Sequence, residues 1–154
     1  VMSGLINFFV QFCMFLIFVL YYTFTGNAVQ PNLYILLTPF FLLLIAMLAL
    51  GFGIIISSLT TKYRDLAVLV TFGVQLWMYA TPIVYPISQI PAKWQSIMLL
   101  NPMAPIVETF RYAFLGSGTI PWFYLGISVV TTLVVLFIGI ILFNKVQKTF
   151  MDTI

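Results

Sequence analysis

Long apolar stretches separated by short polar segments make up most of the chain. They run from about 4 to 24, 33 to 58, 66 to 84 and 122 to 143. An α-helix needs about 20 apolar residues to cross a hydrocarbon core of about 30 Å. The pattern therefore predicts an all-α integral membrane protein whose four transmembrane helices form one domain, residues 1–154.

Composition supports this reading and excludes several function classes. Apolar residues make up 63% of the chain and charged residues 6%, whereas soluble domains carry about 25% charged residues. Histidine is missing and the three acidic residues are scattered, so a metal site or a base-activated nucleophile lacks its usual parts. Six basic residues are too few for a nucleic-acid surface, and Cys13 reads as a small packing residue. We expect neither an enzyme nor a bound cofactor.

Two local features of the second stretch affect how it packs. Pro39 stands in its early turns and predicts a kink. Ala49, Gly53 and Ser57 recur every four residues, a spacing of small side chains that favours close helix packing. Residues 25–32 before this stretch predict a turn.

Basic residues fix the expected orientation. Lys62 and Arg64 follow the second apolar stretch, and Lys145 and Lys148 follow the last; both pairs should face the cytoplasm. The chain between the two pairs must then cross the membrane an even number of times. The stretches 66–84 and 122–143 supply two crossings, so residues 86–116 are expected to enter and leave from the outer side as a re-entrant helical hairpin.

Helix start and stop signals within residues 86–116 agree with a hairpin. Pro91 starts a helix of about ten residues, Asn101 and Pro102 read as N-cap and first residue of a second, and Gly116 ends it. Helices of about 10 and 14 residues measure about 15 and 21 Å, too short to span about 30 Å of hydrocarbon. Re-entrant structure of this kind needs burial in protein or a wet cavity.

The second of these short helices carries an acid and a base. Glu108 and Arg111 lie three residues apart and can pair on one helix face. Charges at membrane depth point to a transport pathway, which makes this pair a candidate external gate together with Asn101 and Pro102. Alternatively, the pair anchors the hairpin against a neighbouring helix. The residues alone leave both readings open.

Three ordered segments resemble a known family. They are "KYRDLAVLVTFGVQLWMYATPIVYPISQIPAKW", "LNPMAPIVETFRYAFLG" and the terminal "FNKVQKTFMDTI". They are similar to the permease subunit of type-2 ABC exporters of bacterial surface polysaccharides, which include O-antigen, capsule and teichoic acid exporters. The likeness covers nearly the whole chain.

This resemblance implies a six-helix permease of the bacterial inner membrane, with its carboxy terminus in the cytoplasm. It implies a homodimer with two separate ATP-binding subunits, which moves a lipid-linked polysaccharide between the protomers. The four stretches would be the last four helices, so the chain would be the carboxy-terminal portion. ATP would bind to the partner subunit, in keeping with the missing phosphate-binding motif G-x-x-x-x-G-K-[ST].

The resemblance also assigns residues. The segment after the second stretch matches the family's second cytoplasmic loop, which contacts the ATPase; its residues are Thr60, Thr61, Lys62, Tyr63, Arg64 and Asp65. The same segment reads as a basic loop that fixes orientation, and the two roles are compatible.

Polar and aromatic side chains near the end of the third stretch form a possible glycan path. Gln75 and Tyr79 lie one helical turn apart on one face, whereas Thr81 is about 200° round from Tyr79. An amide beside a flat ring suits a sliding sugar, although aromatic residues near a span's end are commonly interfacial anchors.

Two other functions compete. A permease of the same superfamily that exports drugs or lipids would share these features. A membrane-embedded hydrolase would need paired acids or an activated nucleophile at membrane depth, which the dispersed acids do not offer.

Overall fold

The fold is an assembly of α-helices, given by a computed structural model that describes residues 2–26 and 31–151, and no β-strand occurs among those residues. Residues 27–30 of the expected turn lie outside the described residues. In chain order the elements are α1 (Met2–Phe24), the 3₁₀ helix η1 (Leu33–Leu37), α2 (Thr38–Lys62), α3 (Leu66–Ala80), the 3₁₀ helix η2 (Ile87–Gln89), α4 (Ala92–Leu99), α5 (Met103–Leu115) and α6 (Trp122–Met151).

Three helical segments within the described ranges are long and apolar enough to cross a membrane: Ile6–Phe24, Leu33–Lys62 and Trp122–Lys148. Helix α3 is equally apolar but has 15 residues, a length of about 22 Å. The all-α character and the multiple membrane-length helices expected from the sequence are therefore confirmed. A fourth helix of full spanning length is not found among residues 2–26 and 31–151.

Two helices end at other residues than their apolar stretches: α2 extends further and α3 ends earlier. Helix α2 continues to Lys62, because the Thr60 and Thr61 hydroxyls donate to carbonyls of their own helix, at 2.8 and 2.7 Å, and leave its backbone bonds intact. Helix α3 ends at Ala80, four residues before the end of the apolar stretch 66–84. Thr81 precedes Pro82 and takes an extended conformation (φ −96°, ψ 131°), which ends the helix. Hydrophobicity continues past this proline, so the apolar stretch extends beyond the end of the helix.

Pro39, where the sequence predicts a kink, lies at the junction of η1 and α2. Pro39 lies in the first turn of the α-helix, where a missing N–H costs no intrahelical bond. The five 3₁₀ residues of η1 precede it directly. The proline thus marks the change from 3₁₀ to α geometry.

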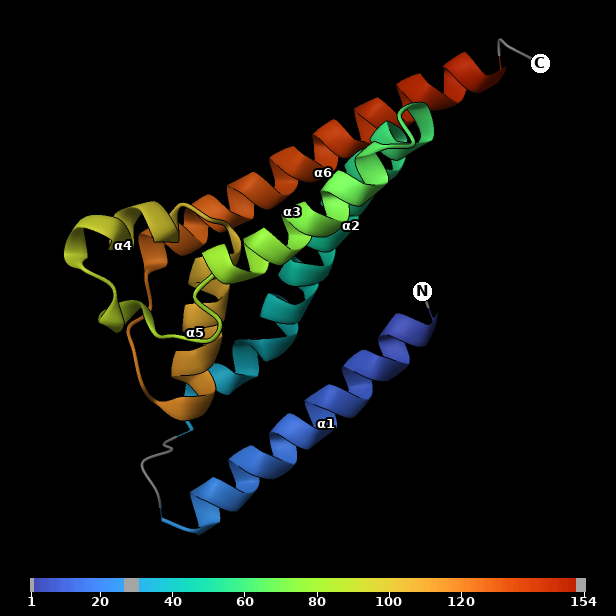
Figure 1. Cartoon of the computed structure of the whole chain (residues 1–154). Helices are drawn as coiled ribbons and strands as arrows, with labels where there is room; N and C mark the ends of the chain where they lie inside the picture. The colour runs from blue at the N-terminus through green and yellow to red at the C-terminus, as the bar shows by residue number, and fades with distance from the viewer. Residues whose placement is uncertain (1, 27–30, 152–154) are drawn as a thin grey trace.

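Helices α2 and α6 form the scaffold of the molecule, running side by side in the same direction (Figure 1). Their buried positions are spaced by three, four or seven residues, the pattern of a coiled-coil seam. These positions are Phe41, Leu44, Leu48, Gly51 and Ser58 on α2 and Leu125, Ser128, Thr132 and Gly139 on α6. The two glycines set the closest approach: a Cβ on Gly51 would lie 3.0 Å from the backbone nitrogen of Leu136.

Helix α5 packs into one end of this scaffold. Ile106 joins a core with Phe41, Leu44 and Leu125, so α5 contacts both α2 and α6. On another side of α5, the Phe114 ring meets Phe15 of α1 edge-on at 5.2 Å between centroids. Seven of the 13 residues of α5 are buried, which makes it the best-covered of the short helices.

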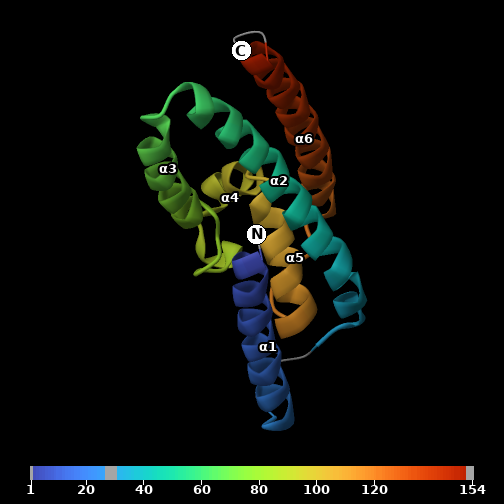
Figure 2. The same cartoon turned by 90° about the vertical axis from the view of Figure 1, so that its right-hand side faces the viewer.

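The two ends of the molecule are built from different elements (Figures 1 and 2). The connection between α2 and α3 lies at the same end as the carboxy-terminal turns of α6, and α4 and α5 lie toward the opposite end. This end therefore includes the last residue of α2, Lys62, the connection with Arg64, and the turns of α6 that hold Lys145 and Lys148. Helices α1 and α3 flank the scaffold with their surfaces largely exposed.

Substituting Gly51 tests the α2–α6 contact. We expect Gly51→Ala to destabilise the protein by about 1–3 kcal/mol, because the added carbon would press on backbone atoms of α6 that cannot turn aside. Gly53→Ala is the matched control, since a Cβ there meets no atom within 4 Å among the described residues. The measurement is the apparent melting temperature in detergent; equal melting temperatures for the two variants would contradict this packing.

Candidate functional site

Glu108 and Arg111 form a buried ion pair on α5. The Arg111 Nη1 donates to the Glu108 Oε2 at 3.1 Å, and the two side chains are 14% and 6% exposed. The predicted i to i+3 pairing is therefore found. Burial of both groups means that each needs further partners to offset the water it has lost.

Arg111 finds those partners in backbone carbonyls of the stretch that follows α3. Its Nη2 donates to the carbonyl oxygens of Ile83 at 2.7 Å and Pro82 at 3.2 Å, and its Nη1 donates to that of Tyr85 at 3.4 Å. These carbonyls lie in a non-helical segment between two prolines. The planar, five-donor guanidinium satisfies several of them at once.

Sequence reasoning missed this role of Arg111, because it paired the arginine with Glu108 alone. The sequence does contain a feature that predicts this need for hydrogen-bond donors. Pro82 and Pro86 bracket a short apolar stretch that cannot be helical throughout, and non-helical backbone in apolar surroundings requires donors for its carbonyls.

Glu108 joins two further segments to the pair. Its carboxylate accepts a hydrogen bond from the backbone N–H of Ile87, at the start of η2. Gly118, in the connection to α6, lies so close that a Cβ there would be 2.7 Å from the Glu108 Oε1, and its φ of +108° also favours glycine. Burial raises the pKa of the Glu108 carboxyl above its usual range, while the charge of Arg111 acts to lower it.

Asn101 connects the beginning of α5 to the end of α3. Its Oδ1 accepts the backbone N–H of Met103 at 3.1 Å, a capping contact made from one residue before Pro102, which holds the N-cap position of α5. Its Nδ2 donates to the Thr81 Oγ1 at 2.9 Å. Pro102 is buried in a helical conformation (φ −61°, ψ −21°), and Gly116 ends the helix in the left-handed region (φ +68°), as predicted.

Together these contacts make one polar cluster, which we call the hairpin cluster: Thr81, Asn101, Glu108 and Arg111 with the carbonyls of Pro82, Ile83 and Tyr85. It joins the end of α3 to α5 through side-chain hydrogen bonds. The structure thus brings Asn101, Glu108 and Arg111 together, and their arrangement can fix the position of the segment after α3.

The expected coupling segment lies far from this cluster. Thr60, Thr61 and Lys62 belong to the last turn of α2, so the connection itself is Tyr63–Asp65. It is a tight turn in which the N–H of Leu66 donates to the Tyr63 carbonyl at 3.1 Å. Its side chains are exposed at the end of the molecule opposite α5 (Figure 1). Helix α3 is the element that links this turn to the hairpin cluster.

Gln75 and Tyr79 lie exposed on α3. The Tyr79 ring is 71% exposed, whereas Thr81, two residues on, is 2% exposed. The two side chains thus differ in exposure, although Thr81 lies just beyond the end of α3 in an extended conformation. The backbone carbonyl of Tyr79 accepts the Tyr85 hydroxyl at 3.0 Å, while its own ring projects from the surface.

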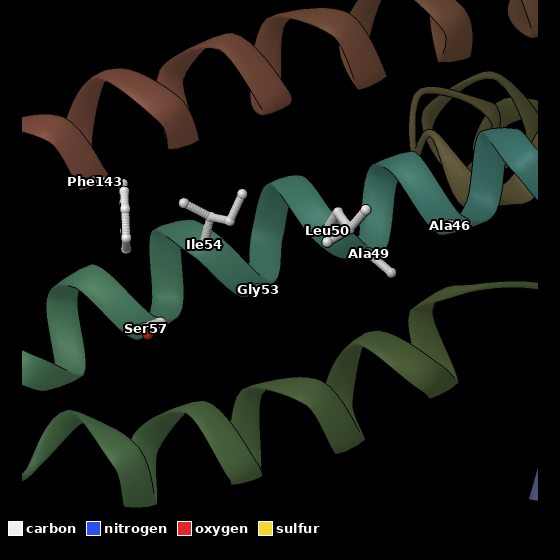
Figure 3. Close-up of a pocket in the computed structure, with 7 residues that line it drawn as sticks. All are labelled: Ala46, Ala49, Leu50, Gly53, Ile54, Ser57 and Phe143. Atoms are coloured by element: carbon white, nitrogen blue, oxygen red, sulfur yellow. The ribbon is translucent and has the colours of Figure 1, made fainter. Parts of the chain in front are cut away.

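Within the described residues, the stripe of small residues on α2 does not carry the closest contact with α6. Ala49, Gly53 and Ser57 line an open groove of about 370 Å³ beside Phe143 of α6 (Figure 3). The close contact with α6 uses Gly51 instead. Among the described residues, no group of three His, Cys, Asp or Glu side chains is placed to hold a metal ion.

The hairpin cluster predicts an asymmetry between its two charges. We expect Arg111→Met to cost about 3 kcal/mol or more, because it leaves a buried carboxylate unpaired and removes the donors of three carbonyls. Glu108→Gln should cost less, since an amide oxygen can still accept from Arg111 and from Ile87. Apparent melting temperatures in detergent measure the difference. A larger loss for Glu108→Gln would show that the carbonyl contacts contribute little.

Comparison with known proteins shows which family this chain is similar to. Residues 1–115 match the family model of the ABC-2 type transporter. Among curated proteins, the chain is similar to the O-antigen export system permease protein RfbA of Klebsiella pneumoniae, at 33% identity over 102 residues. It is also similar to the capsule polysaccharide export inner-membrane protein BexB of Haemophilus influenzae, at 30% identity over 112 residues.

These alignments cover a larger share of this chain than of its relatives. They include 66% and 68% of this chain, but the chain spans only 39% and 40% of the length of the two relatives. A third relative, the inner membrane transport permease YadH of Escherichia coli K12, aligns at 29% identity over 59% of the chain and 33% of its own length. Since the family model covers about three quarters of the residues, the chain belongs to the ABC-2 type transporter membrane family.

Proposed function

We propose that this chain is part of a permease subunit that exports lipid-linked polysaccharide across the bacterial inner membrane. The observation that carries the proposal is the similarity to permeases named for O-antigen and capsule polysaccharide export. These names favour a glycan over a drug or another lipid as cargo. ATP hydrolysis belongs to a separate partner subunit, and the working permease contains two copies of the subunit.

The proposed topology has four crossings and one re-entrant hairpin. Helices α1, α2 and α6 cross as full-length spans, and α3 crosses together with the extended segment from Thr81 to Pro86. Residues 86–116 enter from the outer face and return to it. The proposal is supported by the common position of Lys62, Arg64, Lys145 and Lys148, which face the cytoplasm under the positive-inside rule, as does the carboxy terminus.

The hairpin cluster gives this topology a physical basis. Non-helical backbone is tolerated at membrane depth where its polar groups are satisfied within the protein. Arg111 provides that satisfaction for Pro82, Ile83 and Tyr85, and α5 itself is packed between α1, α2 and α6. A 15-residue helix followed by an extended stretch can therefore complete a crossing.

The same arrangement suggests a mechanism. The turn at Tyr63–Asp65, with the adjoining residues Thr60–Lys62, contacts the ATP-binding subunit. Displacement of this turn moves α3, which carries Gln75 and Tyr79 along the glycan path. The hairpin cluster fixes the far end of α3 and so positions the outer exit. Glu108 and Arg111 then act as both gate and anchor, because the anchor determines the shape of the exit.

Sidedness of two lysines tests the topology. In a Cys13→Ser background, the Lys93→Cys variant should react with a membrane-impermeant maleimide in intact spheroplasts, because α4 lies in the external hairpin. The Lys148→Cys variant should react after the membrane is permeabilised. Reaction of both variants from the same side would reject the re-entrant hairpin while leaving the family assignment untouched.

Charge reversal tests the hairpin cluster in export. We expect the double variant Glu108→Arg with Arg111→Glu to lose export by about tenfold or more, since a carboxylate at position 111 cannot donate to the three carbonyls. Surface polysaccharide is quantified in cells that express the full permease with its ATP-binding subunit at matched membrane levels. Lys93→Met, an exposed change on α4, is the control. Normal export by the reversed pair would mean that the ion pair alone suffices.

A further inference from the structure

The connection between α5 and α6, residues 116–121, turns back along α5. Gly116 and Gly118 both have positive φ, +68° and +108°, so the backbone enters this half of conformational space twice within three residues. The Gly116 N–H donates to the Tyr112 carbonyl at 3.0 Å and closes the helix. The chain then returns toward the start of α6 (Figure 1), which brings Gly118 against the side chain of Glu108.

The contact between Gly118 and Glu108 leaves no room for a side chain at position 118. A Cβ built on Gly118 would lie 2.7 Å from the Glu108 Oε1 and 3.6 Å from its Cδ. The first of these separations is an overlap, so either the carboxylate or the connection would have to move. The carboxylate therefore requires a glycine here, in addition to the requirement set by φ.

Chain geometry limits how far the two partners can separate. Glu108 precedes Gly116 by eight residues, which is about 12 Å along the helix axis. The two residues from Gly116 to Gly118 cover at most about 7 Å of this distance, even when fully extended. The side chain of Glu108 has to cover the remainder, so it extends toward the connection.

Three different segments hold the Glu108 carboxylate. Its Oε2 accepts from the Arg111 Nη1 at 3.1 Å, the backbone N–H of Ile87 donates to it, and Gly118 lies against its Oε1. Glu108 is 4% exposed, so close-packed protein atoms enclose it. A shift that makes room for a Cβ at position 118 would therefore strain the contacts with Arg111 and Ile87.

Arg111 depends on the position of this carboxylate. Glu108 neutralises the guanidinium, whose donors also bind the carbonyls of Pro82, Ile83 and Tyr85. If the carboxylate moves, Arg111 either follows it and leaves these carbonyls or stays and loses its counter-charge, which is costly in a buried place. In both cases the segment after α3 is held less firmly.

We propose that Gly118 is a positioning residue for the outer exit of the transport path. Its bare backbone fixes the Glu108 carboxylate, and Glu108 fixes Arg111 and with it the segment Pro82–Tyr85. The connection thus couples the beginning of α6 to the hairpin cluster, so that α5, α6 and the segment after α3 respond together. The role in the exit rests on the proposed function, whereas the contact itself is independent of the cargo.

Cysteine labelling at position 87 tests the contact in the purified complex of the full permease with its ATP-binding subunit. Ile87 is 8% exposed, so Ile87→Cys should react slowly with a maleimide when the other cysteines, Cys13 among them, are replaced by serine. Adding Gly118→Ala should raise this rate about fivefold or more, because a displaced Glu108 carboxylate releases the N–H of residue 87 and η2 opens more often.

Gly26→Ala is the matched control for this labelling. Gly26 also has a positive φ, +73°, but a Cβ there would meet no atom of the described residues within 4 Å. Alanine at either position strains the backbone, and Gly118→Ala alone presses on a carboxylate. Equal labelling rates in the two variants would overturn the proposal.

A shorter acid at position 108 provides a compensating change. Glu108→Asp withdraws the carboxylate by up to about 1.5 Å, one C–C bond length, which makes room for a Cβ at position 118. Gly118→Ala should therefore lower the apparent melting temperature by several degrees in the unsubstituted protein and by clearly less in the Glu108→Asp background. If Gly118→Ala does not fold alone, folding in the Glu108→Asp background supports the proposal. An equal loss in both backgrounds, or failure to fold in both, would overturn it.

Export measures the positioning role. We expect Gly118→Ala to reduce surface polysaccharide by about fivefold or more at matched membrane levels, because the segment that shapes the exit is held less firmly. Gly26→Ala should export normally, and normal export by Gly118→Ala would overturn the positioning role. Labelling and melting do not depend on the cargo, so a lack of polysaccharide export by the unsubstituted exporter would count against the proposed function alone.

Discussion

The need to satisfy backbone carbonyls in apolar surroundings governs this structure. Helices satisfy their own backbone, but the chain between α3 and η2 passes through a non-helical stretch bracketed by Pro82 and Pro86. Three carbonyls of that stretch are bound by one guanidinium, that of Arg111, which is itself neutralised by Glu108. The acid and the base therefore have complementary roles in this apolar chain. The arginine supplies hydrogen-bond donors for the carbonyls, and the glutamate balances its charge.

Packing of the other helices around α5 holds that arginine in place. Arg111 projects from α5, and α5 is positioned by apolar contacts with α1, α2 and α6. The close pairing of α2 and α6 through Gly51 and Gly139 provides the rigid side. In contrast, α3 is attached mainly at its two ends, by the turn at Tyr63–Asp65 and by the hairpin cluster. An element held at both ends and exposed between them suits the transmission of movement across a membrane.

The sequence predicted those features that depend on local spacing. The Glu108–Arg111 pair follows from a three-residue separation on a helix, the cap at Asn101 from its place before Pro102, and the end at Gly116 from the freedom of glycine. Each of these is decided within a few residues of chain.

Features decided by distant contacts could not be predicted in the same way. The carbonyls bound by Arg111 lie 26 to 29 residues away along the chain, and only the fold brings them near. The closest approach of α2 falls at Gly51 instead of the regular stripe Ala49, Gly53 and Ser57, because the register with α6 selects it. Apolar character persists past Pro82 although helix α3 ends at Ala80, so hydropathy alone does not locate the end of this helix.

The most direct test of this account is an electron cryo-microscopy map of the complete exporter in lipid nanodiscs, at a resolution that shows side chains. The account predicts that the Arg111 guanidinium contacts both the Glu108 carboxylate and the carbonyl oxygens of the segment Pro82–Tyr85. An Arg111 side chain turned toward the transport path, with that segment helical or bonded to other donors, would contradict it.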